Sequence, residues 1–203
     1  MNPVLNFMWI MKKLAFQTAR VRRISEYADL IKPYQLSARG NGRKTLDIGC
    51  GKNPRNPFGS DLVYGVDLSA DLDNRISAAD LVSEPIPFST AEFDFVTAFD
   101  FLEHIPRVAY LPARAFPFVN LMNEIWRVLK PGGLFLSVTP AYPFLSAFDD
   151  PTHVNFITIN TFPKYFDNRF RYAAIYGFRG SFEVLGQGLK SEHLVSVLRK
   201  EIL

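Results

Sequence analysis

The stretch Thr45-Leu46-Asp47-Ile48-Gly49-Cys50-Gly51 is a short apolar run that turns abruptly through two glycines. Such a run predicts a buried β-strand, and the glycines let the backbone approach a ligand at the strand's carboxyl end. A second run, Val63-Tyr64-Gly65-Val66-Asp67, ends in an acid placed to bind the hydroxyls of a ribose. Taken singly, Asp47 could cap a turn and Asp67 could terminate a strand. Taken together, they favour a nucleoside-containing ligand at the edge of an α/β sheet.

Pro54 stands where a dinucleotide-binding fingerprint would place its third glycine. Cradling of a pyrophosphate at a helix N-terminus is therefore poorly supported. The pattern favours a nucleoside cofactor without a pyrophosphate, and it argues against a nicotinamide-dependent dehydrogenase.

The order of the remaining elements predicts a parallel α/β sheet. Buried strands are expected at four apolar runs: Thr45–Ile48, Leu62–Val66, Phe93–Phe99 and Leu134–Thr139. Between the last two, apolar residues at helical spacing from Phe118 to Leu129 predict a helix that Pro131-Gly132-Gly133 ends. Phe182–Leu185 and Leu194–Leu198 are expected to form a hairpin that completes the sheet.

The composition limits the class of protein. With 203 residues, 48% of them hydrophobic and 21% charged, the chain can form one domain with a sizeable core. The single cysteine, Cys50, excludes an internal disulfide and fits a reducing compartment, so we expect a cytoplasmic protein. The sequence contains no apolar run long enough to span a bilayer.

The positive charge is concentrated at the N-terminus. Residues 1–44 carry a net charge of +7, whereas the rest of the chain carries −4. We therefore divide the chain into a basic helical leader (residues 1–43) and a second domain (residues 44–203), with a helix predicted over residues 3–31, before Pro33. The apolar start of this helix either lies on a membrane surface or packs on the body of the protein. We expect packing.

The motifs also match a known family in their order. The chain resembles class I S-adenosylmethionine-dependent methyltransferases of the small type 11 kind, over about residues 44–140. The resemblance is carried by five motifs. The first three are Asp47-Ile48-Gly49-Cys50-Gly51, Asp67 and Ala79-Asp80-Leu81. The fourth is the stretch from Ile86-Pro87-Phe88 to Phe93-Asp94-Phe95-Val96, together with Leu102-Glu103-His104-Ile105, and the fifth is Asn123-Glu124-Ile125-Trp126-Arg127-Val128-Leu129-Lys130-Pro131-Gly132-Gly133. It implies a Rossmann-like, doubly wound, mostly parallel seven-stranded sheet with an antiparallel C-terminal hairpin.

The resemblance implies S-adenosyl-L-methionine as the cofactor and assigns residues to its parts. Gly49, Cys50 and Gly51 would line the methionine portion, with Asp47 orienting their loop, and Asp67 would hold the ribose hydroxyls. The adenine and the sulfonium would be met by five further residues: Leu68, Asp80 and Leu81 for adenine, and Ala98 and Phe99 for the methionine and sulfonium.

The early crossovers are shorter than the family pattern. Only about a dozen residues separate the first two strands, and Ser69–Arg75 alone precede the third, whereas a parallel crossover usually needs roughly 10–12 residues with its helix. We therefore expect these helices to be shortened or missing, and the N-terminal helix to cover the sheet face that they leave exposed.

Methyl transfer from a sulfonium needs a positioned nucleophile, and a general base only for a weak nucleophile such as a hydroxyl. The candidate bases are His104, Asp150, His153 and Tyr142. His104 could equally be a residue that bonds the backbone at a helix start, and Asp150 and His153 could equally belong to a turn with capping side chains. We expect no metal site, because the one cysteine and three histidines lie far apart in the sequence.

The predicted function is methyl transfer to a hydroxyl of a small molecule or glycan. A nucleic-acid (ribose) methyltransferase and a non-catalytic cofactor-binding partner protein are the alternatives. Phe99-Asp100-Phe101-Leu102 stands where base-modifying enzymes often carry Asn/Asp-Pro-Pro-Tyr, which argues against an exocyclic amine as acceptor. Most of the 19 phenylalanines lie between Phe88 and Phe182, and we expect part of them to form the water-excluding mouth of the acceptor site.

Overall fold

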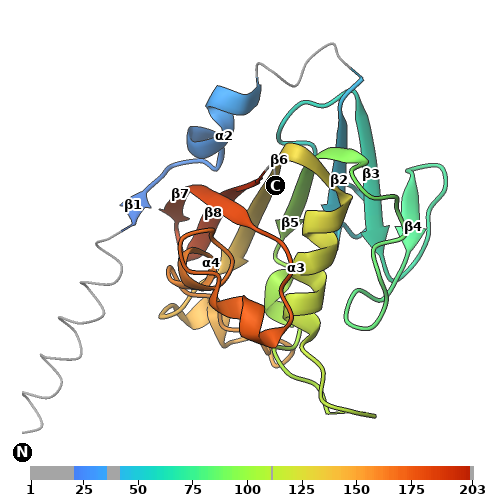
Figure 1. Cartoon of the computed structure of the whole chain (residues 1–203). Coiled ribbons are helices and arrows are strands. Elements are labelled where there is room, and N and C mark those ends of the chain that lie inside the picture. The colour runs from blue at the N-terminus through green and yellow to red at the C-terminus, as the bar shows by residue number, and fades with distance from the viewer. Residues whose placement is uncertain (1–20, 36–41, 111, 202–203) are drawn as a thin grey trace, which may run out of the picture.

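A computed structural model describes residues 21–35, 42–110 and 112–201. Its eight-stranded sheet has the order β1-β7-β8-β6-β5-β2-β3-β4 (Figure 1). The strands are β1 (Arg22–Arg23), β2 (Lys44–Ile48), β3 (Leu62–Asp67), β4 (Ile76–Ala78), β5 (Phe93–Phe99), β6 (Leu129–Pro140), β7 (Phe182–Lys190) and β8 (His193–Lys200). Only β8 runs antiparallel to its neighbours; all other pairs are parallel. The predicted α/β sheet with a C-terminal hairpin is confirmed.

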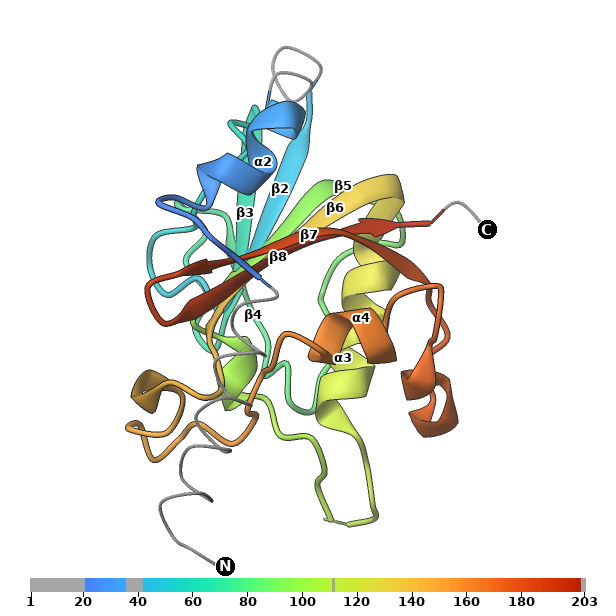
Figure 2. The same cartoon turned by 90° about the vertical axis from the view of Figure 1, so that its left-hand side faces the viewer.

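The helices lie on the two faces of this sheet, α2 on one side and α3 with α4 on the other (Figure 2). They are α2 (Ala28–Gln35), α3 (Pro117–Val128) and α4 (Thr161–Tyr165), with short 3-10 turns at Leu102–His104, Leu145–Ala147 and Tyr172–Tyr176. Helix α3 starts with Pro117. The N–H groups of a helix's first turn have no partner within the helix, so a proline, which has no N–H, is well suited to this position. The helix buries one apolar stripe. No described helix is both long and apolar enough to cross a bilayer.

The early crossovers contain no α-helix, since residues 49–92 are all described and form only strands, turns and irregular segments. Other groups cover that face of the sheet. The ring of Phe58 stacks on Phe95 with 4.2 Å between centroids, and Ile31 of α2 is fully buried in the same cluster. The Gln35 amide donates to the Pro57 carbonyl oxygen at 2.8 Å, which ties α2 to the first crossover. Helix α2 and the ring of Phe58 therefore supply packing that crossover helices normally provide.

The leader differs from the predicted helix. Residues 1–20 lie outside the described residues, but Arg22–Arg23 form a strand, and the helix that follows continues through Pro33. The expectation of one helix over residues 3–31 is thus wrong for its described part, and the expected seven strands become eight. Strand β1 can pair with β7 because Gly188 has no side chain, and a Cβ there would come within 2.9 Å of Ile24. The domain boundary at residue 44 stays a prediction.

Candidate active site

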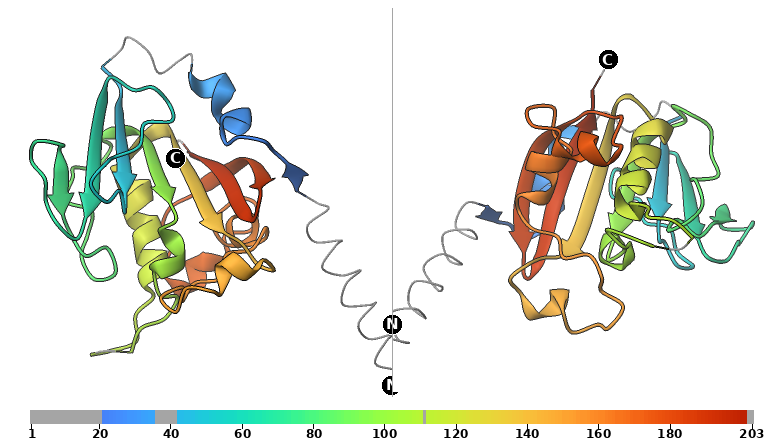
Figure 3. Two further views of the ribbon diagram at one scale, coloured as in Figure 1. Left: turned by 180° about the vertical axis from the view of Figure 1, so that it is seen from behind. Right: turned by 60° about the horizontal axis from the view of Figure 1, so that its bottom comes forward.

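The carboxyl ends of β2, β3, β5 and β6 meet at one edge of the sheet, where ligands bind in open α/β folds. The yellow-orange segment that follows β6 lies below the same edge (Figure 3). Every sequence-predicted site residue comes from the strand ends or loops of this region. The sequence positions alone could not show which of these side chains touch.

The glycine turn after β2 is held by the neighbouring strand. The Gly49 N–H donates to the Val66 carbonyl oxygen at 2.8 Å, and Gly49 and Gly51 have φ angles of 65° and 58°. A left-handed φ of this kind favours glycine. Beside Gly51 the space is open, whereas a Cβ on Gly49 would come within 2.2 Å of the Phe101 ring. The turn thus has one free side, and Phe101 forms a wall on the other.

Asp67 joins the turn to the end of β3. Its Oδ2 accepts the Gly51 N–H and its Oδ1 accepts the Leu68 N–H, both at 2.8 Å. A carboxylate can accept about four hydrogen bonds, so Asp67 keeps capacity for the hydroxyls of a ligand. Leu68 beside it is 73% exposed and offers an apolar surface.

Asp47 is buried beneath the turn. Its Oδ1 accepts the Thr97 hydroxyl at 2.6 Å, and its Oδ2 accepts the Arg55 N–H at 2.8 Å. Burial raises its pKa to about 6, against the lowering effect of these hydrogen bonds and of the Arg55 charge. Burial likewise raises the pKa of Cys50 to about 11, helped by the Asp47 and Asp67 carboxylates, so this thiol is protonated at neutral pH.

The remaining cofactor candidates differ in exposure. Asp80 is exposed and its carboxylate accepts hydrogen bonds from the Val82 N–H and the Ser83 hydroxyl, as a turn cap does. Leu81 and Ala98 belong to the core cluster on the α3 side of the sheet. Phe99 belongs to the α2 side, where its ring lies 4.6 Å from the Arg55 guanidinium.

Two histidines distant in the sequence are adjacent in the structure. The rings of His104 and His153 are 4.9 Å apart, and Glu103 completes a cluster whose potential ligand atoms lie within 4.8 Å of one another. Glu103 is 2% exposed and its Oε2 accepts the Thr139 hydroxyl at 2.8 Å; burial raises its pKa. His104 and His153, although far apart in the sequence, are thus adjacent in space, and the absence of a metal site stays a prediction.

Asp150 contacts the cluster through Thr152. Its Oδ1 accepts the Thr152 hydroxyl at 2.6 Å, and that hydroxyl oxygen lies 3.0 Å from His104 Nδ1. Among the described hydrogen bonds, none joins the side chains of the candidate bases Asp150 and His153. Instead, the backbone N–H of His153 donates to the Asp150 carbonyl oxygen at 3.0 Å.

Sequence reasoning missed several residues of this region. His193 Nε2 lies 3.1 Å from Asp100 Oδ1, and this contact raises the pKa of His193 and lowers that of Asp100. No sequence signal links these two residues, because the return of β8 alone brings them together. Glu103 could have been found, since it precedes His104 within the Leu-Glu-His-Ile motif.

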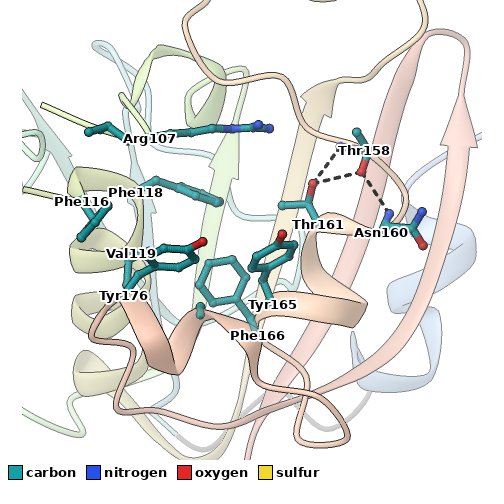
Figure 4. Close-up of a pocket in the computed structure, with 12 residues that line it drawn as sticks. Arg107, Phe116, Phe118, Val119, Thr158, Asn160, Thr161, Tyr165, Phe166 and Tyr176 are labelled. Atoms are coloured by element: carbon teal, nitrogen blue, oxygen red, sulfur yellow. Dashed lines mark hydrogen bonds between the residues drawn. The ribbon is translucent and has the colours of Figure 1, made fainter.

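An aromatic cavity of about 450 Å³ lies among α3, α4 and the turn at 172–176 (Figure 4). Its walls come from the segment before α3, from α3 and α4, and from the turn at 172–176; they comprise Arg107, Val108, Phe116, Phe118, Val119, Thr158, Asn160, Thr161, Tyr165, Phe166, Ala173 and Tyr176. Arg107 Nε donates to the Asn155 side-chain oxygen at 2.7 Å. Since Asn155 lies two residues after His153, the cavity wall and the cluster share one loop.

Comparison with known proteins identifies the class. Residues 19–176 match the family described as a methyltransferase domain. The chain is 31% identical over 133 residues to 24-methylenesterol C-methyltransferase 2 of Oryza sativa subsp. japonica, which covers 57% of this chain and 34% of that one. It is 27% identical over 126 residues to a probable S-adenosylmethionine-dependent methyltransferase of Mycolicibacterium smegmatis, covering 52% and 41%. The chain thus spans well under half the length of these two relatives.

A solved structure shares the fold at low identity. The S-adenosylmethionine-dependent methyltransferase from Archaeoglobus fulgidus superposes with a TM-score of 0.53 at 15% identity, covering 86% of this chain and 92% of that one. The chain therefore belongs to the methyltransferase-domain family. The Mycolicibacterium smegmatis relative and the Archaeoglobus fulgidus protein are both named for dependence on S-adenosylmethionine.

The site fits this cofactor. The open space beside Gly51 leaves room for a ligand against the backbone of the turn. The Asp67 carboxylate at the end of β3 can accept hydrogen bonds from ribose hydroxyls, and the exposed Leu68 offers an apolar surface.

Proposed function

We propose that this methyltransferase acts on a hydroxyl of a small-molecule or glycan acceptor. The observation that carries the proposal is the aromatic cavity whose wall residue Arg107 is hydrogen-bonded to Asn155, in the loop that also carries His153 of the Glu103–His104–His153 cluster. Aromatic walls suit the flat, apolar faces of sugars and small rings, and the nearby polar groups suit a hydroxyl.

The cofactor assignment follows the strand ends. We assign the methionine portion to Gly49, Cys50 and Gly51, with Asp47 orienting their loop through the Arg55 N–H. Asp67 would hold the ribose hydroxyls. The adenine and the sulfonium we assign to Leu68, Asp80, Leu81, Ala98 and Phe99. Because Ala98 and Phe99 are buried, their contribution would be the shape and the backbone of the strand end.

The bound cofactor supplies a methyl group on an activated sulfonium. The protein's part is then to orient the acceptor, exclude water and accept a proton. Thr152 gives its hydroxyl hydrogen to Asp150, so its oxygen accepts from His104 Nδ1–H. The neutral His104 ring therefore has a lone pair on Nε2, and this atom can accept the proton of an acceptor hydroxyl. His153 and Asp150 support this role, His153 by ring contact and Asp150 through Thr152.

Calorimetry with S-adenosyl-L-methionine tests the cofactor assignment. Asp67→Ala is expected to weaken binding by at least about tenfold, because it removes the acceptor for the ribose hydroxyls. Asp73→Ala removes an exposed carboxylate from the next loop and is the matched control. Undiminished binding by Asp67→Ala would overturn the assignment.

An acceptor screen tests the substrate class. It should contain nucleotide sugars, glycans and small phenols, with a sterol included because the rice relative is named for sterol C-methylation. We expect formation of S-adenosylhomocysteine with a hydroxylated acceptor, and slower turnover in His104→Ala at unchanged cofactor affinity. Turnover with RNA alone, or tight cofactor binding without turnover, would contradict the proposal.

A further inference from the structure

We propose that Glu103, His104 and His153 bind one divalent transition-metal cation of the zinc class. The role given to this metal below, holding the acceptor hydroxyl, rests on the proposed function. The binding site itself does not.

The three side chains converge closely enough for shared coordination. Their potential ligand atoms all lie within 4.8 Å of one another. In the tetrahedral geometry of zinc, bonds of about 2.0–2.2 Å to nitrogen and oxygen place two ligand atoms roughly 3.3–3.6 Å apart, about 1.2–1.5 Å closer than the widest separation here. Small side-chain movements therefore suffice to close the cluster on a cation.

Two ligand atoms of the cluster are buried and have no hydrogen-bond partner among the described residues. They are Glu103 Oε1 and His153 Nδ1. An unpaired buried polar atom is costly and uncommon, so each requires an explanation. The other carboxylate oxygen of Glu103 is held by the Thr139 hydroxyl at 2.8 Å, which keeps the side chain oriented. A cation would satisfy both unpaired atoms at once.

The hydrogen bonds around His104 prepare it as a ligand. Asp150 Oδ1 receives the Thr152 hydroxyl, so His104 Nδ1 must be the donor to the Thr152 oxygen and Nε2 carries the lone pair. Metal-binding histidines commonly donate their second ring nitrogen to a polar group in this way. The Asp150–Thr152 pair therefore sets the tautomer that coordination needs.

The backbone holds the two halves of the cluster together. The N–H groups of Val154 and Asn155 both donate to the Glu103 carbonyl oxygen at 2.9 Å, and the Asn155 side chain donates to the Leu102 carbonyl oxygen at 3.0 Å. His153 is thus fixed against the turn that carries Glu103 and His104. Such preorganisation lowers the cost of collecting ligands that lie far apart in the sequence.

The ligand set indicates the kind of cation and its use. Two imidazoles and one carboxylate suit zinc and similar transition metals, whereas magnesium and calcium prefer oxygen ligands. Three protein ligands leave a coordination position open. In the metal-bound protein His104 Nε2 is occupied and no longer accepts the proton. An acceptor hydroxyl bound at the open position would instead lose its proton to solvent, its O–H bond breaking while the oxygen keeps the electron pair.

Metal binding to chelator-stripped full-length protein tests the site. We expect one Zn²⁺ or Co²⁺ per chain by calorimetry, a Co²⁺ absorption spectrum typical of nitrogen and oxygen ligands, and no comparable affinity for Mg²⁺. Glu103→Gln and His153→Asn should each lower the affinity by at least about 100-fold, because loss of an outer-shell partner alone commonly costs about 10–100-fold. His193→Asn is the matched control, because His193 pairs with Asp100 and is no part of the cluster.

The outcomes are separable. Cofactor binding and melting temperature report whether each variant is folded, and His104→Asn, at a half-buried position, replaces Glu103→Gln if the latter unfolds. Absence of stoichiometric binding, or binding that the cluster variants leave unchanged, would overturn the proposal and favour metal-free proton transfer to His104 Nε2. Specific metal binding without hydroxyl methylation would contradict the proposed function and leave the metal site standing.

Discussion

Replacing Asp47 by asparagine should stabilise the protein while weakening its cofactor site. Asp47 is 1% exposed, and burial raises its pKa from 3.8 to about 6. The folded state therefore binds this proton more tightly than the unfolded state does. The neutral Asp47 carboxyl contributes to the free energy of unfolding. This contribution is fully present below about pH 4 and is lost as the pH rises to about 6. At pH 7 the buried charge costs about 3 kcal/mol, since each pKa unit corresponds to about 1.4 kcal/mol.

Asparagine is neutral and has nearly the same shape. Its side-chain oxygen can accept the Arg55 N–H, and its NH₂ group can donate to Thr97 once the threonine hydroxyl turns. Allowing for imperfect geometry, we expect Asp47→Asn to gain about 1–3 kcal/mol at pH 7, or about 3–10 °C in melting temperature. Cofactor affinity should fall by about tenfold, because the loop that Asp47 orients loses a charge-assisted bond.

Urea denaturation between pH 4.5 and 7.5 measures this effect. The gain of Asp47→Asn over wild type should be small at pH 4.5 and should reach its full size near pH 7. Asp73→Asn, at an exposed position, is the control and should change stability by less than about 0.5 kcal/mol throughout. A gain that does not depend on pH, or a loss of stability at pH 7, would refute the reasoning.

Two further predictions concern packing and charge. Ile31→Ala should lower the free energy of unfolding by about 2–4 kcal/mol, because Ile31 is fully buried over the sheet face that lacks crossover helices. Leu72→Ala, at an 86% exposed residue, is the control and should change this free energy little. Equal losses for the two variants in chemical denaturation would contradict the packing role of Ile31. His193→Gln should lower the free energy of unfolding by less than about 1 kcal/mol at pH 6, and by less still at pH 8.5. Asp100 raises the pKa of His193, and their ion pair is lost as the pH rises through that pKa. Thermal melts in which the loss of stability is larger at pH 8.5 than at pH 6 would disprove this prediction.

Local patterns determined much of the fold. The apolar runs at Thr45–Ile48 and Phe93–Phe99 each form a strand, and the helix expected before Pro131 ends at Val128. These features depend on residues that are neighbours in the chain, so periodicity and turn residues suffice to predict them. The two-glycine turn followed by Asp67 likewise predicted a nucleoside cofactor, because its chemistry belongs to consecutive strand ends.

Tertiary structure decided what covers the sheet and which polar groups meet. The sequence shows that the crossovers are short, but only the fold shows Phe58 and Ile31 packed where helices are missing, and Arg22–Arg23 pairing beside Gly188. Helix propensity in the leader was overridden there by hydrogen bonding to an edge strand.

The polar cluster arises in the same way. Glu103 and His153 come from elements about 50 residues apart, and the hydrogen bonds from Val154 and Asn155 to the Glu103 carbonyl oxygen bring them together. Sequence spacing cannot reveal such a contact, because it depends on where the loop after β6 folds back against the end of β5. The strand-end residues that we assign to the cofactor therefore follow from local sequence, whereas the cluster that we assign to the acceptor forms only once the chain is folded.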